Sequence, residues 1–166
     1  MKKTPSADEL QSEAQEFQAS RQTVMLATAD QAGMPHVSYA PFALDDEGGM
    51  CILVSELAQH TRDLLMTGKV HAMLIADEQD ARNLFARKRL LLECDVEEIG
   101  RKATAWPELL QSLAQRFGNT IGLLEQLPDF HLFRLLPTQG SYVRGFGQAY
   151  QVSGSHLKIG DKQTKG

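Results

Sequence analysis

The sequence has few cysteines. Cys51 and Cys94 are the only two in 166 residues, and they lie far apart, outside any Cys-x-x-Cys arrangement. Two such residues are too few for a disulfide framework or for a metal site built from cysteines. Free cysteine usually behaves as a small apolar residue. We therefore predict that both are buried thiols.

Long apolar runs and an excess of positive charge are also absent. The longest apolar stretches, such as 50–54 and 72–76, are far shorter than the roughly 20 residues that cross a bilayer. The polar and acidic residues after Lys2 and Lys3 do not resemble a secretory signal. With 17 Lys+Arg against 21 Asp+Glu, the formal charge of −4 lacks the basic excess that nucleic acids require. We expect a cytoplasmic protein that binds neither a membrane nor nucleic acid.

Strong catalytic signatures are missing as well. The sequence contains no glycine-rich phosphate loop, no His-Glu-x-x-His and no Gly-x-Ser-x-Gly. Hydrolases and nucleoside triphosphatases therefore lose most of their support. The composition, 42% hydrophobic and 23% charged, is typical of one ordinary folded domain.

Turn signals divide this domain into short strands, with helices inserted late. A capping box at Ser6–Glu9 predicts an N-terminal helix over 6–20. Strands are predicted at 23–29, 35–44, 50–54, 70–76 and 89–97, helices at 57–66 and 106–127, and a final hairpin of 130–136 and 141–150 around Pro137–Gly140. Close strand spacing favours an antiparallel meander, so we predict a mainly β fold, a small closed or split barrel with peripheral helices. The domain spans 1–154, and the small, polar segment 155–166 is predicted to be a flexible tail.

Cationic and hydroxyl residues gather at the ends of predicted strands. They are Ser55, His60, Thr61 and Arg62 after one strand, and Arg87, Lys88 and Arg89 before another. The planar guanidinium group suits phosphate or carboxylate, and hydroxyls at a helix start add donors near the positive end of the helix dipole. The two groups either hold a phosphorylated cofactor between them or are solvated charges that flank the strands.

The histidines and one aspartate form a second set of candidates. His36, His71 and His131 fall within strand patterns, which favours surface or half-buried positions over ligand roles. His156 lies in the glycine-flanked tail, where an imidazole could reach a metal centre, although a solvated side chain is the commoner case. Asp129 follows a proline and precedes an apolar strand, which is typical of a turn residue.

Four stretches resemble one known family. They are Thr23–Thr28, Val37–Phe42, Leu84–Leu90 and Gly145–Tyr150. Each is similar to the HutZ/HugZ haem-utilisation family, a branch of the pyridoxamine 5′-phosphate oxidase-like, FMN-binding split barrels. The Phe-Ala-Arg-Lys-Arg and Gly-Phe-Gly-Gln-Ala-Tyr blocks are the most specific part of this resemblance.

The resemblance implies a homodimeric, antiparallel split barrel with ligand sites between the subunits. It also implies that the protein binds haem and degrades it oxidatively, with dioxygen and an external reductant, in bacterial haem-iron utilisation. By position, Arg89 resembles the family's basic residue near the haem, and His60 the histidine of its Leu-Ala-x-His segment. Asp129 resembles the acid that supports the proximal ligand from the partner subunit.

The family's axial ligand is a histidine of the C-terminal tail, within Gly-His-Arg/Lys. Here Gly160–Lys162 carries aspartate in that place. Carboxylate is a poor substitute for imidazole on haem iron. If a histidine ligates the iron, we expect it to be His156.

Two alternatives stay open beside haem degradation. In an FMN-dependent oxidoreductase of the wider superfamily, the phosphate would be held by Ser55, Thr61, Arg62, Arg87 and Arg89. The flavin ring would then lie near Val37, Ser38 and Tyr39. The other alternative is a haem or flavin carrier without turnover.

Overall fold

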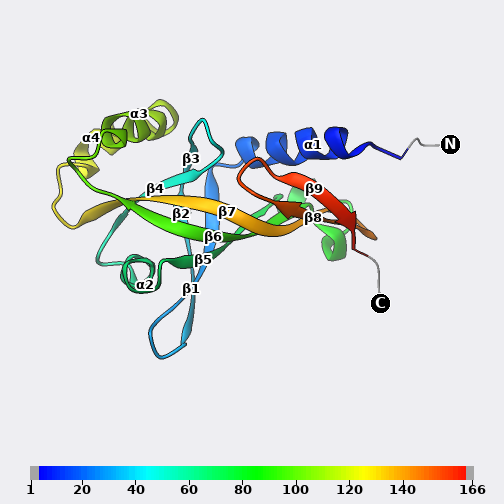
Figure 1. The fold of residues 1–166 in the computed structure, drawn as a ribbon, viewed down its shortest axis with the longest axis horizontal. Coiled ribbons are helices and arrows are strands. Elements are labelled where there is room, and N and C mark those ends of the chain that lie inside the picture. Colours follow the sequence, from blue (N-terminus) through cyan, green and yellow to red (C-terminus); the bar gives the residue numbers. More distant parts are fainter. Residues whose placement is uncertain (1–3, 164–166) are drawn as a thin grey trace.

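The computed structural model describes residues 4–163, which form one curled antiparallel sheet with helices around it (Figure 1). The strands are β1 (Thr23–Ala29), β2 (Pro35–Pro41), β3 (Ala43–Leu44), β4 (Met50–Ser55), β5 (Lys69–Ile75), β6 (Arg89–Ile99), β7 (Phe130–Gly145), β8 (Gln148–Ser153) and β9 (Lys158–Lys162). Their order is β2-β1-β5-β6-β7-β4-β3, and β8 pairs with both β7 and β9. Among the described strands, no hydrogen-bonded pair joins the two ends of this order, β2 and β3. The curled sheet is therefore an open, split barrel, as predicted.

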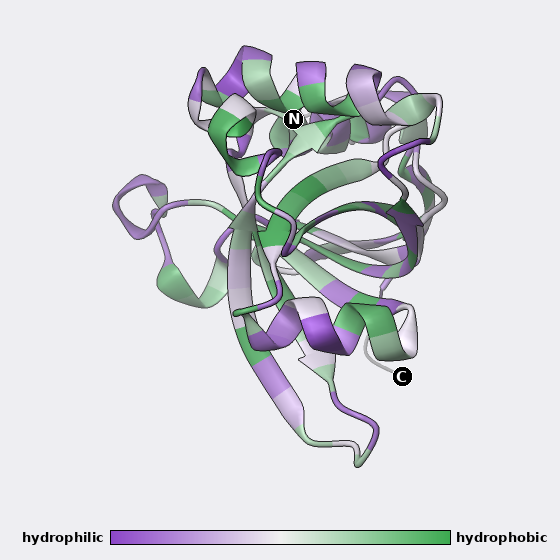
Figure 2. Ribbon diagram, turned by 90° about the vertical axis from the view of Figure 1, so that its left-hand side faces the viewer, coloured by the Kyte–Doolittle hydropathy of each residue, from purple (hydrophilic) through white to green (hydrophobic). Residues whose placement is uncertain are grey.

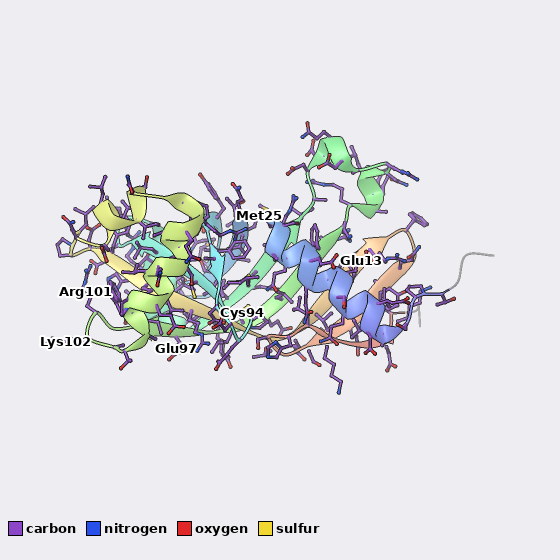
Figure 3. The ribbon with its side chains drawn as sticks, turned by 90° about the horizontal axis from the view of Figure 1, so that it is seen from above. Glu13, Met25, Cys94, Glu97, Arg101 and Lys102 are labelled. Atoms are coloured by element: carbon purple, nitrogen blue, oxygen red, sulfur yellow. The ribbon has the colours of Figure 1, made fainter. Side chains whose placement is uncertain are left out.

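Within the described part of the chain, four helices and two short 3₁₀ turns surround the sheet. They are α1 (Ala7–Ser20), α2 (Gln59–Thr67), α3 (Ala105–Phe117), α4 (Thr120–Leu124), η1 (Glu78–Asp80) and η2 (Leu84–Ala86). The predicted capping box is present, because the Ser6 hydroxyl accepts from Glu9 N and the Glu9 carboxylate accepts from Ser6 N. Figure 3 shows α1 crossing obliquely over the sheet, with Glu13 on it. No helix within residues 4–163 is long and apolar enough to cross a membrane.

Strand β4 is buried on both faces, which explains its continuous apolar sequence. Ile52 belongs to the core inside the curled sheet. Cys51 and Leu53 belong to a second core, where Trp106 and Leu113 of α3 cover the sheet. In Figure 2, α3 and α4 lie across the top of the sheet. Cys51 and Cys94 are both buried free thiols, as predicted.

The predicted hairpin around Pro137–Gly140 is wrong. Strand β7 runs without interruption through these residues and pairs with β6 along its length. The register shifts between Glu93 and Cys94, and the extra residue on β7 is Thr138. The residues that suggested a turn therefore form a bulge. The actual turn lies between β7 and β8, where Gly147 has a φ of +65°.

The prediction of a flexible tail over 155–166 is also wrong for the part that the structure describes. Residues 158–162 form β9, which pairs with β8. Leu157 is fully buried in the core, and the His156 carbonyl accepts hydrogen bonds from the side chains of Gln11 and Gln15. One apolar anchor and two hydrogen bonds thus fix the segment. Residues 164–166 lie outside the described part of the chain.

Candidate functional site

One face of the sheet is left open by the helices. Side chains alternate along each strand, so Leu26 and Leu92 point into the core while their neighbours point outward. The outward side chains of Val37 and Tyr39 on β2 are 76% and 65% exposed. We call the outward surface of β2, β1, β5, β6, β7 and β8 the open face.

The strand register arranges the open face in rows that cross the sheet. The first row is Val37, Ala27, His71, Glu93, Gln139 and Ser153. The second is Tyr39, Met25, Met73, Leu91, Ser141 and Gln151, and a third contains Ile75, Arg89, Val143 and Ala149. Apolar side chains therefore concentrate on β2, β1 and β5, and polar ones follow toward β8.

The described residues form several hollows on this face, and two of them share His71 and Leu91. One of about 190 Å³ is mainly apolar, and its lining includes Met25, Val37 and Met73. The other, about 470 Å³, lies over β6 to β9, with Glu93 and other polar side chains in its lining. His71 lines both hollows, so an imidazole stands where the apolar and the polar parts of the open face meet.

Of the predicted basic residues, Arg89 lies at one end of the open face, whereas Lys88 pairs with Glu13 of α1 on the covered side. Arg89 begins β6 and pairs across the sheet with Ile75 and Val143. Its guanidinium donates to the Arg87 carbonyl at 2.9 Å. Arg87 itself donates to the Ala76 carbonyl, so its orientation is fixed by the backbone at the end of β5.

The predicted hydroxyl group lies around the start of α2. Ser55 Oγ donates to Asp129 Oδ2 at 2.6 Å, and Thr61 Oγ1 donates to the Ser55 carbonyl at 2.6 Å. The guanidinium of Arg62 donates to the Glu56 carbonyl and to the side chain of Gln59. Asp129 is thus tied to Ser55, and the two residues join the end of β4 to the segment before β7.

Within one chain, the two predicted anion-binding groups lie at opposite ends of β6. Arg89 is the first residue of this eleven-residue strand, whereas Ser55 is level with the region beyond its last residue, Ile99. At about 3.4 Å per residue the strand spans roughly 34 Å. The groups around Ser55 and Arg89 therefore do not meet along the sheet of a single copy.

The predicted stretch Val37, Ser38 and Tyr39 is divided between two faces. Ser38 points to the side covered by α2, where its Oγ lies 2.8 Å from Nδ1 of the buried His60. Burial lowers the pKa of His60 despite the nearby charge of Asp63, and so keeps the imidazole neutral. His60 Nε2 has no hydrogen-bond partner among the described atoms. Only Val37 and Tyr39 belong to the open face.

Helix α2 is positioned by the buried carboxylate of Asp63, a residue that was not predicted from the sequence. Asp63 is 1% exposed and accepts from Thr28 Oγ1 at 2.7 Å and from Gln59 Nε2 at 2.8 Å. Burial would raise the pKa of Asp63, but the hydrogen bonds from Gln59, Thr28 and His36 together lower it. The alternation of β1, which turns Thr28 inward among apolar residues, is the one sequence signal that indicates a buried polar partner.

His156 lies away from the open face. It occupies the turn between β8 and β9, and its side chain is exposed. Its carbonyl is held by α1, which packs with Ala14 and Phe17 against the covered side of the sheet. The contacts within one chain therefore do not bring His156 together with Asp129 or Arg89.

These features define a class of protein, the antiparallel split barrels with one open sheet face. A family model described as pyridoxamine 5′-phosphate oxidase matches residues 10–144. HutZ of Vibrio cholerae, named a heme oxygenase, is 47% identical over 148 residues, which cover 89% of this chain and 84% of HutZ. The chain belongs to the pyridoxamine 5′-phosphate oxidase family, in the branch that contains HutZ, which confirms the resemblance found in the sequence.

Solved structures agree with this assignment. A crystal structure of HutZ from Vibrio cholerae, described there as a heme storage protein, matches with a TM-score of 0.73 and 43% identity, covering 78% of this chain and 90% of that one. ChuZ of Campylobacter jejuni matches with a TM-score of 0.83 and 26% identity, covering 98% of this chain and 68% of ChuZ.

Proposed function

We propose that this protein binds haem on the open face and degrades it oxidatively, with dioxygen and an external reductant, in bacterial haem-iron utilisation. The similarity to HutZ, named a heme oxygenase, supports this proposal. The structural observation that carries it is the open face itself, where an apolar area, an imidazole and a guanidinium group occur on neighbouring strands.

The residues of the open face fit haem. Haem is a flat apolar macrocycle with two carboxylate side chains and an iron that takes a nitrogen ligand. Met25, Val37 and Met73 offer a polarisable apolar surface for the macrocycle. Arg89, at the end of the same face, suits the carboxylates, because guanidinium and carboxylate form paired charge-assisted hydrogen bonds.

We propose that the working unit is a homodimer with the haem cleft between two open faces. Exposed apolar side chains such as Val37 and Tyr39 are typical of a surface that a partner covers. A two-fold arrangement pairs the same patch from each copy. It also offers a way for the Ser55 group of one copy to approach Arg89 of the other, which one chain alone does not achieve.

Bound haem supplies the iron at which dioxygen is activated. The chain binds and orients the macrocycle on the open face and keeps water from it. We propose that Arg89 and Asp129 act beside the bound group, Arg89 on the carboxylates and Asp129 as acceptor for a ligand imidazole of the partner subunit. In the ligand set implied by the family resemblance, that imidazole belongs to His156.

Two other functions have specific support. A haem carrier without turnover is favoured by the description of HutZ as a storage protein. An FMN-dependent oxidoreductase is favoured by the cluster of Ser55, Thr61 and Arg62 at the start of α2, where hydroxyl and guanidinium donors suit a phosphate. In that case Val37 and Tyr39 would lie near the flavin ring.

Absorbance spectra separate the three functions. The purified protein is measured as isolated, after addition of haem, and then with ascorbate under air. A haem-degrading protein gives a Soret band that decays with ascorbate, whereas a carrier keeps a stable Soret band. A flavin spectrum in the isolated protein, with no Soret band after haem addition, would contradict the proposal.

We propose a cytoplasmic location on the basis of the cysteines. Burial is the largest cause that raises the pKa of Cys51 and of Cys94 to about 12, so both stay protonated and unreactive. Two unpaired thiols of this kind suit a reducing compartment. Fractionation of the native host with an antibody against the protein tests this location.

A further inference from the structure

Two methionines lie side by side on the open face. Met25 of β1 and Met73 of β5 are directly opposed in the strand register. Residues in such a pair have Cβ atoms about 4.5–5.5 Å apart, so the two thioethers belong to one small area. Both side chains line the apolar hollow of about 190 Å³. Met25 is 37% exposed and Met73 is half-buried, so both sulfur-containing side chains border the surface on which we propose that haem lies.

The other described methionines lie away from this surface. Met50 is fully buried in the core. Met34 is 59% exposed and lies in the turn between β1 and β2, beyond the rows of the open face. Met66 is 57% exposed and lies on α2, which packs on the covered side of the sheet, where His60 contacts Ser38. An oxidant dissolved in the surrounding water should therefore reach Met34 and Met66 first.

The proposed reaction brings an oxidant to the open face instead. It supplies dioxygen and an external reductant to bound haem, and two electrons and two protons convert dioxygen to hydrogen peroxide. Hydrogen peroxide oxidises the thioether of methionine to the sulfoxide. The O–O bond breaks and one oxygen atom forms the S–O bond, while the other leaves as water after proton transfer. The sulfur loses the two electrons that the peroxide gains.

We infer that Met25 and Met73 are modification sites that are oxidised to sulfoxides during turnover, and that this oxidation limits haem binding. The inference rests on the proposed function, because the peroxide is formed where haem is bound. A sulfoxide is polar, whereas the hollow that the two side chains line is mainly apolar. Oxidation therefore removes apolar contact surface from the haem site, and enzymatic reduction of the sulfoxides restores it.

Peptide mass spectrometry of the full chain measures the sulfoxide at each methionine. After incubation with haem and ascorbate under air, Met25 and Met73 are expected to carry several-fold more sulfoxide than Met34 and Met66. Haem-free protein with added hydrogen peroxide is the control and should show the reverse order, because Met34 and Met66 are the more exposed pair. Catalase in the solution destroys peroxide that has left the face, so it should protect Met34 and Met66 but not Met25 and Met73.

Haem titrations before and after turnover measure the effect on binding, and each protein is compared with its own starting affinity. Wild type is expected to bind fresh haem several-fold more weakly after turnover, and treatment with methionine sulfoxide reductase should restore its affinity. The double variant Met25→Leu, Met73→Leu keeps apolar side chains of similar volume and should keep its starting affinity. Met34→Leu, Met66→Leu is the matched control and should weaken as wild type does.

Three results would overturn the inference and leave the proposed function standing. They are a turnover sample with more sulfoxide at Met34 and Met66 than at Met25 and Met73, protection of all four residues by catalase, and decay of the Soret band without sulfoxide on the open face. An equal loss of affinity in the Met25→Leu, Met73→Leu variant would overturn the effect on haem binding. A wild-type protein that takes up no haem overturns the proposed function and the inference together.

Discussion

His36 of β2 and Asp63 of α2 are joined by a hydrogen bond of 2.8 Å between Nδ1 and Oδ2. The carboxylate is almost completely buried, whereas the imidazole is partly exposed. Thr28 and Gln59 complete the set of donors to Asp63. Two strands and one helix therefore meet at one carboxylate, which holds α2 and the Thr61–Arg62 segment against the sheet.

Replacing Asp63 is expected to destabilise the protein strongly. Asp63→Ala leaves the Thr28 hydroxyl and the His36 ring without their shared acceptor, and removal of one member of a buried charged network costs about 3–5 kcal/mol. Asp63→Asn is expected to cost less, because it keeps one acceptor oxygen. Urea unfolding at neutral pH measures both variants. Asp80 is exposed, so Asp80→Ala is the control and should change the free energy of unfolding by less than about 0.5 kcal/mol. Equal effects of the substitutions at Asp63 and Asp80 would contradict this role of Asp63.

Glu13 is expected to hold α1 on the sheet. Its carboxylate accepts from Tyr142 Oη at 2.6 Å and Arg144 Nε at 2.8 Å, and pairs with Lys88 Nζ at 2.9 Å. Burial raises the pKa of Glu13, but these partners outweigh it and lower the pKa overall. Glu13→Ala leaves the buried Tyr142 hydroxyl without a partner and should cost about 1–3 kcal/mol.

Hydrogen exchange measures the local effect of Glu13→Ala. Amides of α1 are expected to exchange faster, while those of β4 and β7 change less. The exposed Glu16 on the same helix gives the control variant Glu16→Ala, which should leave α1 protected. Unchanged protection of α1 in Glu13→Ala would show that apolar packing alone fixes the helix.

His131 is expected to make stability depend on pH. Burial lowers the pKa of His131, but the hydrogen bonds to Glu98 and Glu56 outweigh it, so the pKa is raised above its ordinary value of 6.5. The folded state therefore binds this proton more tightly than the unfolded state does. The stabilisation is complete below about pH 6.5 and is lost as pH rises through the raised pKa.

A comparison of wild type with His131→Gln across pH isolates this effect. The difference in the free energy of unfolding should be about 1 kcal/mol at about pH 6 and should shrink as the pH rises toward about 9. Glu98→Gln removes one of the two partners and should weaken the pH dependence. A difference that stays constant over this range would mean that His131 contributes through packing and not through its charge.

Val37 is expected to decide the oligomeric state. A charge on the open face should prevent two copies from pairing there, because a buried unpaired carboxylate costs several kcal/mol. Val37→Asp should therefore run as a monomer in light scattering and lose haem binding, while its exposed site leaves the monomer folded. Leu123→Asp, on the 68% exposed Leu123 of α4, is the control and should remain a dimer. A wild-type protein of monomeric mass would contradict the homodimer.

Local signals in the sequence predicted many of the elements correctly. The capping box at Ser6–Glu9 and the alternation over β6 depend on neighbouring residues alone, so both were visible. The bulge at Thr138 could not be predicted from the sequence, because proline and glycine at 137–140 are compatible with a turn as well as with a bulge. The order of residues 158–162 was missed for another reason. It depends on tertiary contacts of Leu157 and His156 with α1 and the core.

The site was predicted as a set of residues but not as an arrangement. Arg89, Ser55 and Asp129 could be chosen by their chemistry. Only the strand register places Ser55 and Arg89 at opposite ends of β6. Register also decides that Val37 faces outward while Ser38 contacts His60. Long-range pairing sets both facts, and a one-residue slip would reverse each of them.

Gly140 gives the last prediction, which tests how closely β6 and β7 approach at the bulge. A Cβ at this position would overlap the backbone carbonyl oxygen of Leu91 and lie 2.9 Å from the carbonyl carbon. Backbone cannot swing aside as a side chain can, so Gly140→Ala should cost about 1–3 kcal/mol in urea unfolding. Gly145→Ala on the same strand is the matched control, because a Cβ there meets no described atom within 4 Å. Since Leu91 belongs to the open face, Gly140→Ala should also weaken haem binding. Equal stability of the two variants would show that the strands can separate at little cost.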